Sequence, residues 1–321
     1  GIDLVLDGER VTMLDGRAGE LCRTLDMDAG ATERSFVWNT EGGKRIKISF
    51  TRMASFVRKN IFTIECRICA DADCSLEIHS QQKALVRNYS NPADPRVGQN
   101  NKLLLCPTAH MLENGASVLE CRTTVSGLRV CTAVRHELSQ DMSGSISYDE
   151  NEHSYTASWS GSLKKGEELR FVKYAAVCDS RREAEPVNAA LVYLADSFGK
   201  LAELYAEQAE YLKSFWEHSL LRIETDDDSG LAMIFNQYQL LQSVGRDGIS
   251  GTASKGLSGE GYEGHYFWDT EIYILPFLSC TNPELARYQL GYRYATLELA
   301  RENARLLGHK SGILFPWRTV S

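Results

Sequence analysis

The segment from residue 256 to residue 271 carries the residue types best suited to bind a polar ligand. A glycine-rich loop, Gly256-Leu-Ser-Gly-Glu-Gly-Tyr-Glu-Gly-His265, leads directly into Tyr266-Phe-Trp-Asp-Thr-Glu271. The loop lacks the Gly-Lys-Ser/Thr ending of a phosphate-binding P-loop and follows no predicted strand, which argues against a nucleotide site. Aromatic rings beside carboxylates are typical of carbohydrate pockets, because rings contact sugar C–H groups while carboxylates accept hydrogen bonds from hydroxyls.

Trp268 and Asp269 are the leading candidates in this segment, and residue types alone leave two interpretations open. Either both contact a sugar, or Trp268 fills the core while Asp269 caps a helix. Asp269 and Glu271 do not form an evident acid pair, since positions i and i+2 do not share a helix face. Glu260 could converge on Asp269 in space, and His265 is either a base or a hydrogen-bonded loop residue.

Two further patterns each have a chemical and a structural interpretation. Phe315-Pro-Trp317 follows Gly312 and is either a packed turn or a second aromatic corner. Cys66-Arg-Ile-Cys69 has the spacing of a zinc or redox motif, but it ends a segment whose alternation is typical of a strand. Residues i and i+3 of a strand face opposite sides of a sheet, so we expect the two thiols to point apart and predict no metal site.

The elements that must position these residues change character near the middle of the chain. Up to about residue 180, apolar and polar residues alternate, as in Ile46, Ile48 and Phe50, and turn residues such as Asn114-Gly115 interrupt the pattern. Short alternating strands separated by turns predict an antiparallel sandwich. The expected strands include residues 1–6, 46–51, 62–69, 74–78, 117–124, 128–134, 153–160 and 169–177, with a long surface loop over 88–101.

From Pro186 onward the hydrophobic period is that of a helix. Apolar residues over 187–215 recur at three- and four-residue spacing, broken only at Gln208, which predicts one long helix beginning at Pro186. Strands followed by helices, without βαβ alternation, exclude a Rossmann arrangement. Further helices are expected over residues 229–241, 267–278 and 282–307, the last with Gly291 as a candidate interruption.

Composition and charge narrow the class of protein. The chain has 321 residues, 43% apolar and 24% charged, which is typical of a globular protein and excludes a disordered one. Its net charge of −8 and pI of about 5.5 argue against nucleic acid or an anionic membrane as partner. No apolar run approaches the ~20 residues that span a bilayer. Nine unevenly spaced cysteines without a secretion signal predict reduced thiols and a cytoplasmic location.

The segment from Lys255 to Phe277 resembles the hallmark sequence of glycoside hydrolase family 65. That family includes inverting phosphorylases of kojibiose, maltose, trehalose and nigerose, besides some hydrolases. The similarity continues in order and spacing over residues 23–28, 33–38, 282–287, 291–294, 300–304 and 312–317. It therefore covers nearly the whole chain.

The resemblance implies both a fold and a site. The fold would be an N-terminal antiparallel β-supersandwich over residues 1–180, a helical linker over 181–225, and the first helices of an (α/α)6 catalytic barrel over 226–321. In the family, the Trp-Asp of the hallmark binds the glucosyl unit where the bond breaks, and this carries over to Trp268 and Asp269. Trp317 matches an aromatic residue that lines the same pocket.

The resemblance also implies an activity. It would be inverting phosphorolysis of an α-glucosyl disaccharide to β-glucose 1-phosphate, with inorganic phosphate as co-substrate and with no metal or cofactor. A hydrolase or glucosyltransferase of the same family, or a binding fragment without turnover, stays open as an alternative. Family members are often dimers, so a homodimer is a further expectation.

The sequence departs from the family pattern at its end. The family's general acid, a glutamate in a Gly-Pro-Asp-Glu-Tyr-like motif, follows the Phe-Pro-Trp corner, and a Lys-Gln pair and the phosphate-binding loop come later. None of these motifs occurs up to Ser321. The residues from 226 onward suffice for about half of a twelve-helix barrel, and further strands usually precede the point matched by Gly1. We therefore expect an internal fragment of a larger enzyme, with the general acid beyond Ser321.

Overall fold

The computed structural model describes residues 1–87, 91, 93, 105–256 and 262–319. The chain forms two compact units, with a boundary between Tyr211 and Leu212. The loop expected over residues 88–101 lies almost entirely outside the described residues. Within the described ranges, no helix is both long enough and apolar enough to cross a membrane.

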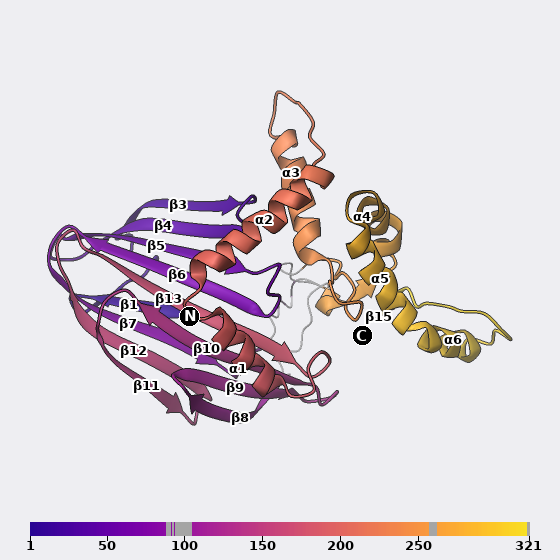
Figure 1. Cartoon of the computed structure of the whole chain (residues 1–321), viewed down its shortest axis with the longest axis horizontal. Coiled ribbons are helices and arrows are strands. Elements are labelled where there is room, and N and C mark those ends of the chain that lie inside the picture. The colour runs from indigo at the N-terminus through magenta and orange to yellow at the C-terminus, as the bar shows by residue number, and fades with distance from the viewer. Residues whose placement is uncertain (88–90, 92, 94–104, 257–261, 320–321) are drawn as a thin grey trace. The chain divides into compact units, whose positions relative to one another are not determined.

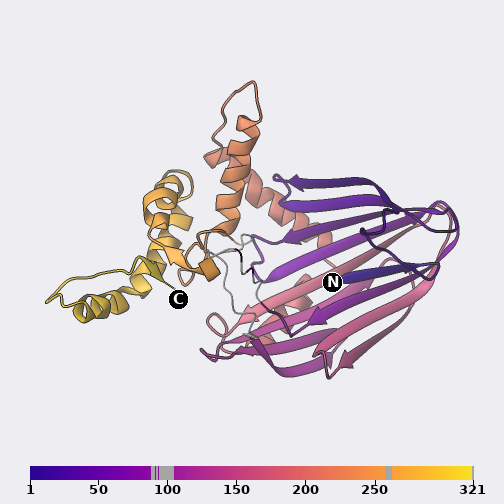
Figure 2. The same cartoon turned by 180° about the vertical axis from the view of Figure 1, so that it is seen from behind.

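The first unit contains two antiparallel sheets that share one buried cluster (Figures 1 and 2). The larger sheet has the order β3-β4-β5-β6-β13-β10-β9-β8, with bounds Ala18–Asp26, Ala31–Asn39, Arg45–Ala54, Ile61–Ala70, Glu168–Asp179, Arg129–Leu138, Ala116–Thr123 and Leu105–Glu113. The smaller has the order β11-β12-β7-β1-β2, with bounds Ser143–Asp149, Ser154–Leu163, Cys74–Lys83, Ile2–Leu6 and Glu9–Arg10. The predicted antiparallel sandwich is therefore confirmed.

The alternating pattern gives central strands of the larger sheet, such as β6 and β13, buried residues on both faces. Ile48 and Phe50 of β5 belong to the cluster between the sheets, together with Ile78 of β7. Met53 of β5 lies on the opposite face and belongs to a second cluster, which includes Leu194 from the helices that follow the strands. One sheet of the sandwich therefore also supports the helical segment.

Cys66 and Cys69 follow the same alternation on β6. Cys66 is buried in the cluster between the sheets, whereas Cys69 lies outside that cluster and is only partly buried. Burial raises the pKa of the Cys66 thiol far above its usual range. The two thiols occupy opposite faces of the sheet, as the strand pattern predicts.

Two dipeptides that end in glycine form tight hairpin turns, one of them the predicted Asn114-Gly115. Asp7-Gly8 joins β1 to β2 with φ of +50° and +80°, and Asn114-Gly115 joins β8 to β9 with φ of +51° and +77°. Positive φ at both central residues is the signature of a type I′ turn, which matches the twist of the flanking strands. These dipeptides therefore fix the register of the two hairpins.

The single long helix predicted from Pro186 is wrong, because the chain forms two helices there. α1 spans Pro186–Ser197 and α2 spans Leu201–Ser219. Between them Gly199 has φ of +76°, a conformation that no residue of an α-helix adopts and that glycine tolerates best. The apolar spacing continues across the break, so periodicity alone does not reveal it.

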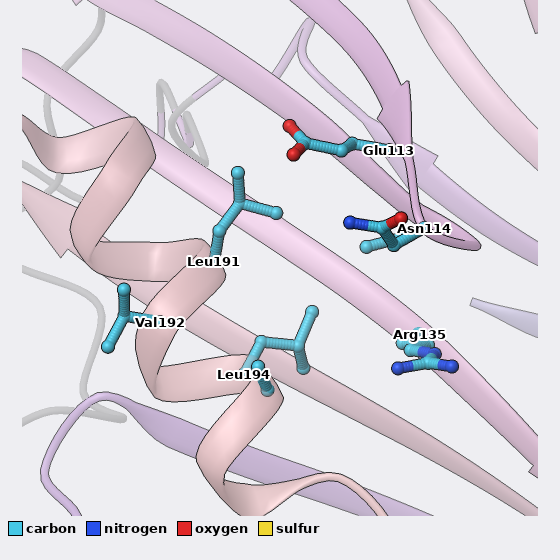
Figure 3. Close-up of a pocket in the computed structure, with 8 residues that line it drawn as sticks. Glu113, Asn114, Arg135, Leu191, Val192 and Leu194 are labelled. Carbon is cyan, nitrogen blue, oxygen red and sulfur yellow. The ribbon is translucent and has the colours of Figure 1, made fainter.

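A pocket of about 230 Å³ lies between α1 and the strands of the larger sheet (Figure 3). Leu191 and Leu194 of α1 line it on one side, and Glu113, Asn114 and Arg135 line it on the other. None of the residues predicted to bind a ligand contributes to this pocket.

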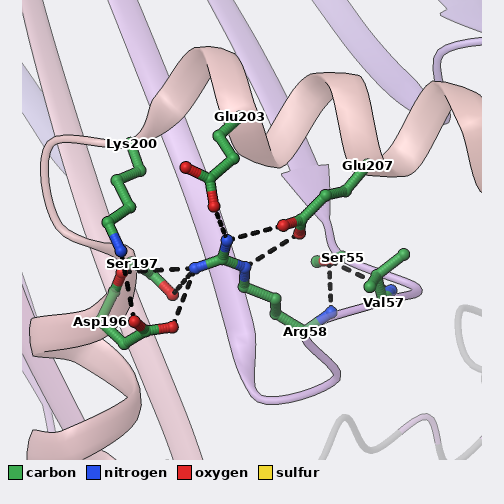
Figure 4. Close-up of polar contacts among 8 residues, drawn as sticks. All are labelled: Ser55, Val57, Arg58, Asp196, Ser197, Lys200, Glu203 and Glu207. Atoms are coloured by element: carbon green, nitrogen blue, oxygen red, sulfur yellow. Dashed lines mark hydrogen bonds and ion pairs between the residues drawn. The ribbon is translucent and has the colours of Figure 1, made fainter.

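Arg58, in the connection between β5 and β6, stabilises the break between α1 and α2 (Figure 4). Its guanidinium donates to the Asp196 carboxylate of α1 at 3.0 Å and to Glu207 of α2 at 2.7 and 2.9 Å, and it also contacts Glu203. Hydrogen bonds to Glu207 and Glu203 raise the pKa of Arg58 above its usual value. These contacts attach part of the polar face of α2 to the sandwich.

Gln208 interrupts the apolar stripe of α2 for a structural reason. It is fully buried, and its Oε1 accepts a hydrogen bond from the Phe56 amide at 2.8 Å. Its Nε2 lies 3.4 Å from the carbonyl oxygen of Gly30 and 3.3 Å from that of Ala54. The side chain therefore satisfies backbone groups where a buried apolar residue would leave them unpaired.

The second unit is mainly helical. Asn282 caps the helix that follows it, because its Oδ1 accepts a hydrogen bond from the Leu285 amide at 3.2 Å. The helices are α3 (Ser229–Ser243), α4 (Leu275–Thr281), α5 (Pro283–Ala295) and α6 (Leu297–Leu306). The short elements are η1 (Tyr262–Gly264), β14 (Tyr266–Phe267), the π-helical turn η2 (Thr270–Ile274) and β15 (Arg318–Thr319).

Two predicted helix bounds in this unit are wrong. The helix expected over 267–278 begins after Phe267, which is a strand residue paired with Arg318. Gly291 does not interrupt its helix, and the break falls at Thr296 instead. A side chain at Gly291 would lie 3.4 Å from the Cα of Gly248, so this glycine allows a loop to approach the helix.

Candidate functional site

A two-stranded ladder brings the two predicted aromatic segments together. Tyr266 of β14 pairs with Thr319 of β15, and Phe267 pairs with Arg318. The strands are antiparallel, so the residue after Phe267 and the residue before Arg318 lie at the same end of the ladder. Trp268 and Trp317, which are far apart in the sequence, occupy these two positions.

The aromatic residues at this ladder divide into one buried ring and two exposed rings. Phe267 is only 6% exposed, and its ring packs edge-to-face against Trp317 at a centroid distance of 5.1 Å. Tyr262 packs against Phe267 in the same manner at 5.4 Å. Trp268 is 57% exposed and Trp317 is 64% exposed. In this structure Trp268 is therefore not a core residue, and both indoles are exposed.

Asp269 follows Trp268 at the start of a distorted helix. It is exposed, and its carboxylate has no hydrogen-bond or ion-pair partner within the described ranges. The helix begins as the π-helical turn η2, in which the Leu275 amide bonds to the carbonyl of Thr270. Such turns occur frequently at functional sites, because they displace a side chain from its regular helical position. Asp269 does not cap the helix with its side chain, so its acceptor atoms are available to hydroxyl groups.

Arg293 of α5 holds the elements of this site in position. Its guanidinium donates to both carboxylate oxygens of Glu271, at 2.7 and 2.9 Å, and lies 3.4 Å from the carbonyl oxygen of Phe267. The same group lies 5.4 Å from the ring centre of Phe315. The Arg293 side chain is only 11% exposed. One largely buried cation therefore connects β14, the turn that follows Asp269, and the Phe-Pro-Trp corner.

A second set of contacts fastens β14 and β15 to α5. The Tyr292 hydroxyl lies 3.0 Å from Oγ1 of Thr319, and the Tyr292 ring packs edge-to-face on Tyr266 at 5.1 Å. A Cβ at Gly251 would lie 3.0 Å from the Tyr266 ring and 3.3 Å from Tyr292. Glycine at 251 therefore allows the loop to lie against the two tyrosines.

The remaining candidates have structural roles or lie outside the described ranges. Nδ1 of His265 lies 2.6 Å from the carbonyl oxygen of Tyr262, which is the hydrogen-bonded loop arrangement. Glu271 is paired with Arg293 and does not form an acid pair with Asp269. Glu260 is not among the described residues. The described residues contain no group of three or more His, Cys, Asp or Glu side chains arranged to hold a metal ion.

Arg293 is the residue that sequence reasoning missed. It lies within the 291–294 segment of the resemblance, but nothing in that segment marks its side chain as a link between strands. Its role depends on contacts with Phe267, Glu271 and Phe315, which α5 brings together only in the folded chain.

Both parts of the chain match one family of carbohydrate-active enzymes. Residues 1–215 match the N-terminal domain of glycosyl hydrolase family 65, and residues 234–321 match the central catalytic domain of the same family. The chain belongs to glycosyl hydrolase family 65, as the resemblance indicated.

Individual relatives agree with this assignment. The alpha,alpha-trehalose phosphorylase of Geobacillus stearothermophilus is 38% identical over 98% of this chain and 41% of its own length. The kojibiose phosphorylase of Halothermothrix orenii is 29% identical over 100% of this chain and 42% of its own length. The solved structure of a candidate kojibiose phosphorylase from the human microbiome superposes with a TM-score of 0.86 at 22% identity, over 99% of this chain and 41% of that chain. The chain therefore spans about two-fifths of the length of these relatives.

Proposed function

We propose that the protein takes part in inverting phosphorolysis of an α-glucosyl disaccharide, giving β-glucose 1-phosphate and a released sugar. The observation that carries this proposal is the exposed Trp268-Asp269 pair beside Trp317 in a chain of this family. Relatives named as trehalose, kojibiose and nigerose phosphorylases support a disaccharide and inorganic phosphate as substrates. No further cofactor is required by this chemistry.

In the proposed mechanism, these residues bind and orient the glucosyl unit. The exposed faces of Trp268 and Trp317 contact the sugar ring, and the Asp269 carboxylate accepts hydrogen bonds from its hydroxyls. A carboxylic acid protonates the glycosidic oxygen while a phosphate oxygen attacks the anomeric carbon from the opposite face. The 321 residues lack the motif that the family uses for this acid, so we propose the activity for a protein that carries both parts of the catalytic domain.

The domain arrangement follows as part of the same proposal. Residues 1–180 form the sandwich, residues 181–225 link it to the catalytic part, and residues 226–321 contribute the first helices of an (α/α)6 barrel. The sugar would bind at the mouth of that barrel. A homodimer in the cytoplasm is consistent with this assignment.

Phosphate-dependent product formation tests the proposal. The intact protein, which carries both parts of the catalytic domain, is incubated with inorganic phosphate and with kojibiose, maltose, trehalose or nigerose in separate reactions, and the anomeric configuration of the product is determined by NMR. We expect β-glucose 1-phosphate from one of these disaccharides. Release of free glucose without phosphate would instead identify a hydrolase, and no product from any α-glucosyl disaccharide would contradict catalysis altogether.

A further inference from the structure

Three arginines occupy neighbouring positions on the inner face of the larger sheet. Phe50 belongs to the cluster between the sheets, so Arg52, two residues later on β5, lies on the same face. Arg34 of β4 pairs with Phe50, and Arg23 of β3 pairs with Arg34. The guanidinium carbons of Arg34 and Arg52 lie 5.4 and 5.7 Å from the Phe50 ring centre. The register therefore gathers three positive charges on adjacent strands.

None of these charges is neutralised by the described part of the chain. Arg23, Arg34 and Arg52 have no hydrogen bond or ion pair to any described carboxylate, and Nε of Arg34 is buried without a partner. Glu33 and Glu65 are the nearest acidic residues along β4 and β6, and by strand alternation they point to the opposite face. Burial and the charges of Arg52 and Arg23 lower the pKa of Arg34. An unpaired cationic cluster is destabilising unless it has an anionic partner.

The arrangement favours a compact anion over an extended acidic peptide. The three arginines project from three consecutive strands, which are ~4.8 Å apart, so their charges are concentrated across a short distance. Carboxylates on one face of an extended peptide are spaced by ~7 Å along a single line. Guanidinium groups bind phosphate oxygens through paired N–H donors, and a phosphate dianion offers several acceptors at one point.

We propose that Arg23, Arg34 and Arg52 form a binding site for a phosphate group, carried either by inorganic phosphate or by a sugar phosphate. Arg34 and Arg52 are partly buried beside Phe50 and define the floor of the site, while Arg23 is exposed and reaches it from the edge strand β3. The exposed Thr32, which pairs with Arg52, adds a hydroxyl donor on the same face. The site does not depend on the proposed catalytic function.

Calorimetric titration with inorganic phosphate and with glucose 1-phosphate, at ionic strength held constant with chloride, tests the site. We expect saturable binding that becomes at least ~10-fold weaker in the double variant Arg34→Met/Arg52→Met. The variant Arg45→Met is the matched control, because Arg45 lies on the same strand but is exposed and paired with Glu20. It should bind phosphate as the parent does. Tighter binding of one of the two compounds identifies the source of the phosphate group.

Thermal unfolding separates loss of the site from loss of the fold. Without phosphate, the double variant should melt at or above the temperature of the parent, because it removes two uncompensated charges. Phosphate should raise the melting temperature of the parent and leave that of the double variant unchanged. The proposal is overturned by unchanged affinity in the double variant, by equal loss in Arg45→Met, or by binding of a glutamate-rich peptide but of neither phosphate compound.

Discussion

The Asp269 carboxylate is exposed, while the backbone on either side of it is held in place by buried neighbours and an ion pair. Its neighbours Phe267 and Thr270 are buried, and the turn that follows is fixed by the ion pair between Glu271 and Arg293. A carboxylate held in this way can orient a sugar without first reorganising, which is where positioning lowers a barrier. The proposed role of Asp269 in orienting the sugar therefore depends on the packing and the ion pair around it.

Replacement of Asp269 tests its role in sugar binding. In the intact enzyme we expect Asp269→Asn to lower kcat/KM for the disaccharide by about 100-fold, because the glucosyl hydroxyls lose a charged acceptor. The control is Glu298→Gln on α6, whose side chain is 83% exposed. Full activity and sugar affinity in the Asp269→Asn variant would remove this residue from the site.

Lys173 makes the stability of the sandwich depend on pH. It is buried on β13, its Nζ donates to the carbonyl of Gln81 at 2.8 Å, and burial lowers its pKa to about 8. In the unfolded chain its pKa is about 10.4. Between these values the unfolded chain binds more protons, so the contribution of Lys173 to stability rises with pH by at most about 1.4 kcal/mol per unit.

Substitution of Lys173 should remove this dependence. Lys173→Met is expected to be more stable than the parent at pH 7, where the buried charge carries its full penalty, and to show a flatter profile from pH 8 to 10. Urea unfolding at each pH measures both effects. Lys47→Met, at an exposed position of β5, serves as the control. A parallel rise in the parent and in Lys173→Met would contradict the assignment.

Secondary-structure elements in this chain are joined by single polar side chains. Arg58 and Gln208 fasten α1 and α2 to the sandwich, and Arg293 connects α5 to β14. Each makes several contacts that apolar packing cannot replace, because the partners are carboxylates or backbone groups.

Gln208 is expected to be essential for the attachment of α2. Gln208→Leu should lower the free energy of unfolding by about 1–3 kcal/mol, because the Phe56 amide loses its acceptor in a buried site. Chemical denaturation measures the change, and Glu210→Gln on the exposed face of α2 is the control. An unchanged free energy in Gln208→Leu would show that water replaces the amide.

Loss of the Arg293–Glu271 ion pair should lower both the stability and the activity of the protein. Arg293→Met is expected to destabilise the protein by about 3 kcal/mol, since it leaves a partly buried carboxylate unpaired. In the intact enzyme it should also lower kcat/KM, because β14 and the Phe-Pro-Trp corner lose their common contact. Arg301→Met, which replaces a half-exposed arginine of α6, is the control. Addition of Glu271→Gln to Arg293→Met should restore part of the stability but not the activity.

Local patterns predicted many of the strands, but they missed β3, β4, β8 and β11 and did not locate the breaks between helices. The alternation around Ile48 and Phe50 indicates a strand with one face buried. This pattern does not depend on which residues pack against that face. The helix breaks at Gly199 and Thr296 do not interrupt the apolar spacing, so the hydrophobic periodicity of the sequence does not reveal them. They depend on contacts such as those of Arg58, which lies far away in the sequence.

The sequence indicated the residues of the candidate site but not their arrangement in space. The types and order of residues 266–271 indicated Trp268 and Asp269, and the resemblance added Trp317. The ladder that joins residues 267 and 318 is a long-range pairing of two residues per strand, too short to leave a pattern. The phosphate site of the sandwich depends on register across three strands, which composition does not encode.

At the scale of the whole molecule, the two units differ in how they bury apolar side chains. Strands β5 and β6 contribute Ile48 and Ile68 to a fully buried cluster, whereas Leu299 and Leu306 of α6 are 66% and 79% exposed. Native-state hydrogen exchange should therefore show amides of α6 exchanging at least ~10-fold faster than those of β6. Equal protection in both elements would contradict this difference.

The pairing of β14 with β15 allows the chain between the two strands to vary in length without moving its ends. The chain leaves the paired strands at Trp268 and returns to them at Trp317. The residues between these two positions therefore form a loop whose ends are held together by the strand pairing. Because loop-closure entropy grows slowly with length, residues added or removed in α6 or in the turn after it leave those ends where they are. The two indoles can thus persist unchanged while the intervening chain is reshaped by insertion and deletion.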